Sequence, residues 1–337
     1  MRPAFIPGVE LSGRLYHEAV RPLLSRHFPG LAHTAALIGR GSEILGFDTQ
    51  RSTDHDWGPR IQLFLHPGEP CAEVSRMLTE HLPATFAGYP MLPNGIVVTE
   101  LGAWFEGHLG FDPRTEITTL DWLATPTQTF AEVTGGEVFH DDLGLHRIRR
   151  DLSWYPDDVW RYLLACQWQR VCEEEPFVGR CGDVGDDLGS AVVTARLVRD
   201  LMRLCLLLER VYPPYSKWLG SAFARLRFAA RLTPMLTAAL AATDWHDRER
   251  CLTAAYEAVG TLHNEAGLTE PVDPATRPFF DRPYRVLAAG RFSLALIAAI
   301  DDPALRDLPL TGAIDQFVDN TVALESRTFS RALFGLR

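Results

Sequence analysis

The apolar pattern of this chain changes near residues 145–156, and this change constrains the fold more than any other feature. Beyond it, apolar residues recur at helical spacing over long segments, as at 188–212, where Leu197, Leu201 and Leu204 share one face. We predict from this periodicity that residues from 151 to 337 form an all-helical domain, with further helices at 219–243, 246–264, 285–299 and 312–334.

The part before the change mixes two periodicities. A helix is predicted over 10–28, and a helical pattern follows in 67–82. A short apolar run occupies 33–39, strand-like segments are predicted at 61–65 and 95–107, and 135–144 is predicted as a turn-strand-turn unit. The fold class is therefore predicted to be α+β, with a mixed sheet and helices in residues 1–150, followed by the helical domain in residues 151–337.

Charge and cysteine usage narrow the class of protein. The formal net charge is -10 and no basic run of five residues occurs, so binding to nucleic acid through its phosphates is not expected. None of the six cysteines forms a Cys-x-x-Cys pair, so no zinc site is predicted. The longest apolar stretch, 293–300, is too short to cross a bilayer, and the first residues lack a signal-peptide pattern. We expect a cytoplasmic protein with reduced thiols.

The segment IGRGSEILGFDTQRSTDHDWGPRIQLFL, residues 38–65, carries the strongest chemical signal. Gly41 and Ser42 follow an apolar run, and a Gly-Ser turn entering a helix offers N–H groups and a hydroxyl to a phosphate. Asp54 and Asp56 come shortly before a predicted strand. If they alternate as strand residues do, both carboxylates point the same way, as a Mg²⁺ site requires. The segment predicts a site for a metal-bound nucleoside triphosphate.

Gly41, Ser42, Asp54 and Asp56 resemble the signature of the nucleotidyltransferase superfamily related to DNA polymerase β. In the helical part, YPPYSKW (212–218) is similar to an element of the small-molecule branch, which includes the aminoglycoside nucleotidyltransferases. GRCGDVGDDLGS resembles the Gly-Asp stretch before a long helix in those proteins. The whole chain is similar to a bacterial family that carries a DUF4037 domain and is grouped with these enzymes.

The resemblance implies a role for each of these residues. Asp54 and Asp56 would hold Mg²⁺, Ser42 beside Gly41 would contact the β- and γ-phosphates, and Lys217 would contact the triphosphate from the helical domain. Residues 1–150 would be the nucleotidyltransferase domain, and the active site would lie in the cleft between the two domains.

Arg180 and Asp186 lie in a Gly-rich loop that either helps to line this cleft or caps the start of a helix. Along the helix that follows, the arginine stripe at 196, 199 and 203 is expected to face solvent, with Asp200 pairing to Arg196 or Arg203. The tryptophans Trp160 and Trp168 are expected in the core.

The chain departs from the superfamily signature in two respects. His55 stands where an apolar residue is usual, and Pro59 is poorly tolerated in a central strand, so the strand is expected to bend after Asp56. The third carboxylate, a second metal ligand or general base, is not evident. We take Glu100 as first choice, with Glu137 and Asp141 as alternatives.

Lys217 is the only lysine in the chain, since every other member of the 33 lysines and arginines is arginine. Its compact ammonium can follow the charge that builds up on a leaving pyrophosphate, whereas the planar fork of arginine needs another approach geometry. The flanking tyrosines and prolines also suit a corner between two helices.

The predicted function is Mg²⁺-dependent transfer of a nucleoside monophosphate, with release of pyrophosphate. ATP, the commonest donor of the branch, is the expected nucleoside triphosphate, and the acceptor is a hydroxyl or phosphate of a small molecule. The alternatives are nucleotidylation of a protein or a tRNA end, a catalytically silent nucleotide-binding regulatory module, and a metal phosphohydrolase.

Overall fold

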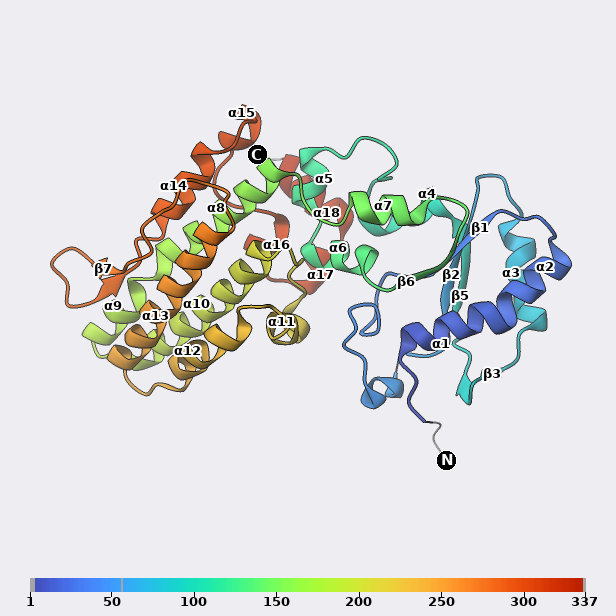
Figure 1. Cartoon of the computed structure of the whole chain (residues 1–337), viewed down its shortest axis with the longest axis horizontal. Coiled ribbons are helices and arrows are strands. Elements are labelled where there is room, and N and C mark those ends of the chain that lie inside the picture. Colours follow the sequence, from blue (N-terminus) through green and yellow to red (C-terminus); the bar gives the residue numbers. More distant parts are fainter. Residues whose placement is uncertain (1–3, 56, 336–337) are drawn as a thin grey trace. The chain divides into compact units, whose positions relative to one another are not determined.

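The computed structural model describes residues 4–55 and 57–335, and it divides the chain into two compact units (Figure 1). Unit 1 contains the chain up to Asp121 together with Thr127–Ser153. Unit 2 contains Trp122–Pro126 and the chain from Trp154 onward. A mixed sheet together with many helices confirms the α+β fold class.

Unit 1 is built on a four-stranded sheet in the order β5-β2-β1-β6. Its strands are β1 (His33–Leu37), β2 (Ile61–Leu65), β5 (Ile96–Glu100) and β6 (Glu137–Asp141), and a separate hairpin is formed by β3 (Thr85–Phe86) and β4 (Tyr89–Pro90). Strand β1 is antiparallel to both β2 and β6, while β2 and β5 are parallel. The sheet is therefore mixed, as its sequence predicts.

Helices pack on the sheet of unit 1. They are α1 (Gly8–Leu15), the π-helix η1 (Tyr16–Val20), α2 (Arg21–His27), the 3₁₀-helix η2 (Gln50–Asp54), α3 (Cys71–His81), α4 (Leu101–Leu109), α6 (Thr127–Thr134) and α7 (Leu145–Asp151), while α5 (Thr119–Ala124) runs from unit 1 into the residues of unit 2. Apolar residues of α1, α2 and α3 form one core with Ala35, Leu63 and Leu65. Phe64 faces the other way and meets Trp104 of α4 edge to face.

The predicted helix over 10–28 exists as a continuous rod with one irregularity (Figure 1). Its middle turn, Tyr16–Val20, has the wider hydrogen-bond spacing of a π-helix. Such insertions are rare and occur frequently at functional sites. Here the insertion begins at Tyr16, a fully buried aromatic residue.

Unit 2 is predominantly helical. Its elements are α8 (Asp157–Glu174), α9 (Phe177–Asp183), α10 (Asp187–Leu208), α11 (Ser216–Phe223), α12 (Ala229–Ala241), α13 (Trp245–Glu265), α14 (Gly290–Ala298), α15 (Pro303–Arg306), α16 (Ile314–Phe317), α17 (Thr321–Glu325), α18 (Arg327–Gly335) and a short hairpin, β7 (Arg277–Pro278) with β8 (Arg285–Val286). Trp160 and Trp168 lie in the core as expected, and the indole of Trp168 donates to Nδ1 of His263 at 3.2 Å.

Some predicted elements are divided in the structure. The helix-like region 312–334 is three short helices, because the backbone turns to extended conformations after the first two, at Val318 and at Ser326. The predicted strand 95–107 ends at Glu100, where α4 begins. The period of apolar residues alone does not mark these breaks.

The arginine stripe of α10 makes different ion pairs from those that the sequence predicts. Asp200 is buried and pairs with Arg170 of α8 at 3.2 Å, not with Arg196 or Arg203. Arg196, Arg199 and Arg203 instead form ion pairs with Glu174, Asp319 and Asp315. The stripe therefore links α10 by ion pairs to α8 and to the C-terminal segment, and it is not simply a solvated face.

The six cysteines carry free thiols. Within the described ranges we find no helix with the length and apolar character needed to cross a bilayer.

We predict that Arg170→Ala lowers the free energy of unfolding by about 3–5 kcal/mol, because it leaves the carboxylate of Asp200 buried without its main cation. The control Arg250→Ala removes the exposed pair with Asp247, which solvent screens, and should cost far less. Urea denaturation of both variants measures the difference, and equal costs would contradict a central role for the Arg170–Asp200 pair.

Candidate functional site

The segment between β1 and β2 contains Gly41, Ser42 and Asp54, and all three lie in unit 1. Gly41 and Ser42 lead into a turn over 42–46, closed by the Phe47 N–H donating to the Ser42 carbonyl at 2.8 Å. The sequence predicts that this turn enters a helix, but no regular helix follows it before η2. A phosphate here would therefore meet turn amides and the Ser42 hydroxyl rather than a helix terminus.

Gly41 has a structural explanation. Its backbone has a φ of 147°, and a Cβ built on it would lie 2.2 Å from a guanidinium nitrogen of Arg60 and 2.7 Å from Oε2 of Glu43. Arg60 donates from Nε to Oε1 of Glu43 at 2.8 Å, and the Glu43 side chain is almost fully buried. The turn can therefore close over this ion pair only if position 41 lacks a side chain.

Asp54 ends the 3₁₀-helix η2 and is not part of a strand. The predicted strand alternation at this position is therefore wrong, because the chain enters β2 only at Ile61. The carboxylate is exposed and accepts a hydrogen bond from Nδ1 of His55 at 2.7 Å, which lowers the pKa of Asp54 below its usual value. Asp56 lies outside the described residues, so its pairing with Asp54 stays a prediction.

Strand register places the candidates for the third carboxylate at different ends of the sheet. Ile61, where the Asp54 segment enters β2, pairs with Ile96, whereas Glu100 pairs with Leu65. At about 3.3 Å per residue, Glu100 lies roughly 13 Å along the strand from that entry. This register does not favour Glu100 as the third carboxylate, and its role stays a prediction.

The two alternative third carboxylates, Asp141 and Glu137, also lie at different ends of the sheet. Asp141 accepts hydrogen bonds from Thr34 and from the N–H groups of Leu145 and His146, so it holds the start of α7. Glu137 pairs with Leu37 at the end of β1 that leads to Gly41, and it is exposed. Of the three carboxylates, only Glu137 lies at the sheet end that receives the Gly41 and Asp54 segments.

The sequence analysis missed another buried carboxylate near this end of the sheet, in addition to Glu43. Nε2 of His108 lies 3.2 Å from Oε2 of Glu132 in α6, and the backbone carbonyl of Glu132 accepts from the N–H of Gly39 at 2.8 Å. Burial opposes ionisation of Glu132, but its interactions with His108 and Gln128 outweigh burial and hold its pKa below the usual value. The Glu132 side chain is therefore ionised, and its backbone carbonyl holds the chain just before Gly41.

The three candidates in unit 2 have different surroundings. Asp186 accepts from the N–H of Gly189 at 2.8 Å, so it is the N-cap of α10, which was one of the two expectations for this loop. Arg180 is exposed near the end of α9, so it lies in a helix and not in the predicted loop. Lys217 is exposed in the first turn of α11, with its ammonium 4.9 Å from the centre of the Trp218 ring.

The lysine at position 217 does not stabilise helix α11. The first turn of a helix carries partial positive charge and favours anions, so a lysine there is mildly unfavourable for α11. Tyr212, in contrast, is buried, and its ring lies 4.8 Å from that of Trp154 and 5.2 Å from that of Tyr155. Tyr212 belongs to the core, whereas Lys217 faces solvent together with Tyr215 and Ser216.

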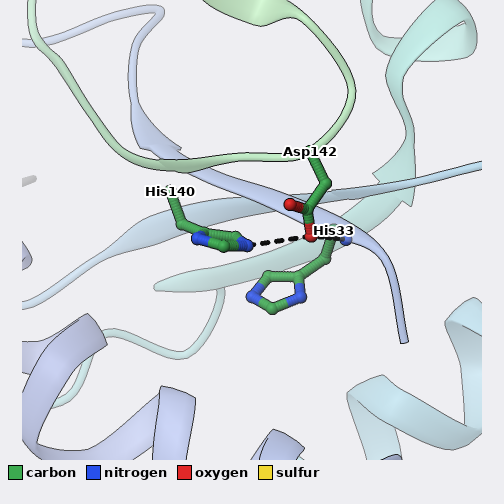
Figure 2. Close-up of side chains that lie close together, drawn as sticks. All are labelled: His33, His140 and Asp142. Atoms are coloured by element: carbon green, nitrogen blue, oxygen red, sulfur yellow. Dashed lines mark hydrogen bonds and ion pairs between the residues drawn. The ribbon is translucent and has the colours of Figure 1, made fainter. Parts of the chain in front are cut away.

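A cluster of metal-ligating side chains lies at the other end of the sheet in unit 1. His33, His140 and Asp142 each place one ligand atom within 4.8 Å of the others (Figure 2). Sequence analysis did not find it, because 107 positions separate His33 from His140. The pair His140-x-Asp142 next to a strand was the available signal.

Comparison with known proteins identifies one family model. Residues 122–219 match the family described as a domain of unknown function, DUF4037, which confirms that part of the resemblance for those residues. The match includes Arg180, Asp186 and Lys217 but not Gly41, Ser42 or Asp54. No curated protein and no solved structure matches the chain.

We predict that Gly41→Ala lowers the free energy of unfolding by about 2 kcal/mol, because the new methyl group strains the backbone and displaces Arg60 from the buried Glu43 carboxylate. Gly107→Ala in α4 is the matched control. It has open space for a Cβ, so it should be neutral or stabilising by up to about 1 kcal/mol. Chemical denaturation compares them, and a Gly41→Ala variant as stable as the control would refute the packing explanation.

Proposed function

We propose that the protein transfers a nucleoside monophosphate from a nucleoside triphosphate, with ATP as the expected donor, to a hydroxyl or phosphate of a small molecule. The reaction needs Mg²⁺ and releases pyrophosphate. The observation that supports the proposal is the antiparallel β1–β2 pair, whose connecting segment at one end of the sheet contains Gly41, Ser42 and Asp54.

The residues present fit a magnesium ion in charge and donor type. Mg²⁺ prefers oxygen ligands, keeps several waters, and usually takes one or two protein carboxylates together with phosphate oxygens. Asp54 is exposed and ionised, and Asp56 supplies the second carboxylate of the proposal. When bound, the ion would neutralise phosphate charge and orient the triphosphate. Asp54 and Asp56 would hold it.

Each remaining residue has a stated task in the proposal. Ser42 offers its hydroxyl to the phosphates, and the lack of a side chain at Gly41 keeps the turn closed. Glu137, at the same sheet end, replaces Glu100 as the group proposed to accept the proton of the acceptor hydroxyl. Lys217 supplies a mobile cation for the charge that develops on pyrophosphate.

A catalytically silent nucleotide-binding module is the second candidate. The observation that favours it is strand register, which puts Glu100 and Asp141 at the opposite end of the sheet from the Gly41 turn, so that the third carboxylate depends on the exposed Glu137 alone among the three considered. A silent module binds nucleoside triphosphate but releases no pyrophosphate with any acceptor. Screening pyrophosphate release against a panel of small-molecule acceptors, with protein and tRNA arms, separates these functions.

We predict that Asp54→Asn abolishes Mg²⁺-dependent pyrophosphate release, because the substitution keeps the shape of the side chain and removes the charge that anchors the metal. Glu80→Gln, which removes an exposed charge on α3 in the same unit, is the matched control and should retain full activity. Steady-state pyrophosphate assays measure both variants. Wild-type turnover by Asp54→Asn would place the metal elsewhere.

For Lys217→Ala we expect a loss of about 2–4 kcal/mol of transition-state stabilisation, seen as a fall in kcat, because the ammonium acts on charge that appears during the reaction. Lys217→Arg should recover only part of this loss, since the charge returns with a different geometry. Arg231→Ala, an exposed cation on α12, serves as the control. If Lys217→Ala and Arg231→Ala have identical kinetics, the lysine has no role in catalysis.

A further inference from the structure

The start of β1 and the end of β6 bring three potential metal ligands together (Figure 2). His33 is the first residue of β1, His140 lies in β6, and Asp142 follows β6 directly. The backbone N–H of Asp142 donates to the His33 carbonyl at 3.2 Å, and the backbone N–H of His33 donates to Oδ2 of Asp142 at 3.2 Å. The strand pair therefore holds the three side chains in place without any ligand.

The hydrogen bonds of His33 define its tautomer. Its Nδ1 lies 2.9 Å from the Leu31 carbonyl, which can only accept, so Nδ1 carries the proton. Burial lowers the pKa of His33 and favours the neutral ring, so Nε2 keeps a lone pair. A histidine that donates one ring N–H to a backbone carbonyl and offers the other nitrogen is the usual state of a metal ligand.

His140 and Asp142 complete the ligand set from the open side. Both side chains are about two-fifths exposed, and Nε2 of His140 lies 2.9 Å from Oδ2 of Asp142. The hydrogen bond from His140 lowers the pKa of Asp142, so this carboxylate is ionised. The rings of His33 and His140 lie 4.5 Å apart, close enough for both to reach one ion.

The π-helix η1 contacts the buried side of this three-residue cluster. Tyr16 begins this turn, and its hydroxyl lies 3.0 Å from Nε2 of His33. Burial raises the pKa of Tyr16 to about 12, so the phenol is a neutral donor to that lone pair. The Tyr16 ring also stacks on His140, with ring centres 6.1 Å apart. A rare backbone insertion therefore directs one side chain at the cluster, as insertions at functional sites do.

We propose that His33, His140 and Asp142 bind one divalent transition-metal ion of the zinc type. Two imidazole nitrogens and one carboxylate oxygen match the ligands that Zn²⁺ takes, and three protein ligands leave a fourth position open. On binding, the metal would take the His33 lone pair that the Tyr16 hydroxyl now occupies, and Nε2 of His140 would bind the metal in place of Asp142, with the single proton of the neutral ring on Nδ1. The absence of a Cys-x-x-Cys pair has no bearing on this ligand set.

This site is separate from the proposed nucleotide site. The His33 end of β1 pairs with Leu65, whereas the Leu37 end leads to Gly41. The two proposals therefore stand or fall independently.

The test titrates the purified, metal-stripped full chain with Zn²⁺ by calorimetry and with Co²⁺ by visible absorption. We expect one equivalent of either ion and the d–d bands of a low-coordinate Co²⁺ site. His140→Ala and Asp142→Asn should each weaken binding by about tenfold or more. His66→Ala, an exposed histidine in the loop after β2, is the control and should bind as the wild type does.

Two outcomes would overturn the proposal: no saturable binding, or binding that neither His140→Ala nor Asp142→Asn weakens. Circular dichroism checks that the variants fold, and Asp142→Asn decides the question if His140→Ala does not fold, because its amide oxygen still accepts from the His33 N–H. Excess Mg²⁺ should leave Zn²⁺ bound, because Mg²⁺ prefers oxygen ligands. Displacement by Mg²⁺ would also count against the assignment.

Discussion

The pairing of β1 on both of its edges is the constraint on which unit 1 depends. All five residues of this strand are buried, and β2 and β6 hold it from either side. A shift of register by one residue would turn Ala35 away from the core that it shares with Leu63, so the register is firmly set. Because the register is set, the strand has two defined ends. One end presents His33 to His140 and Asp142, and the other leads into the turn that contains Gly41 and Ser42.

Some of the residues that the sequence singles out have a structural role, and others have none that is comparable. Gly41 lacks a side chain because the Arg60–Glu43 pair occupies that space, and Asp186 caps α10. Tyr212 fills an aromatic core. Asp54 and Lys217 have no comparable structural role: both are exposed, and Lys217 stands where a helix prefers an anion. The functional hypothesis therefore rests mainly on these two charged residues.

Sequence reasoning succeeded where a local pattern of residues determines the secondary structure. The apolar period of α10 and α13 and the compact run of β2 predict helices and a strand that the structure contains. It failed where a partner distant in sequence decides. Asp200 pairs with Arg170 of α8 rather than with Arg196 or Arg203 of its own helix, as predicted from helical spacing. The strand predicted around Asp54 is a 3₁₀ turn.

The sequence by itself determined the α+β class, most of the long helices and the nucleotidyltransferase hypothesis, because periodicity and motif spacing are properties of neighbouring residues. The tertiary structure decided which carboxylate shares a sheet end with Asp54, since that depends on strand order and register. It also brought His33 to His140 and Asp142 across 107 positions of the chain. Such proximity arises only when β6 pairs with β1, because a contact between distant residues leaves no periodic trace in either segment.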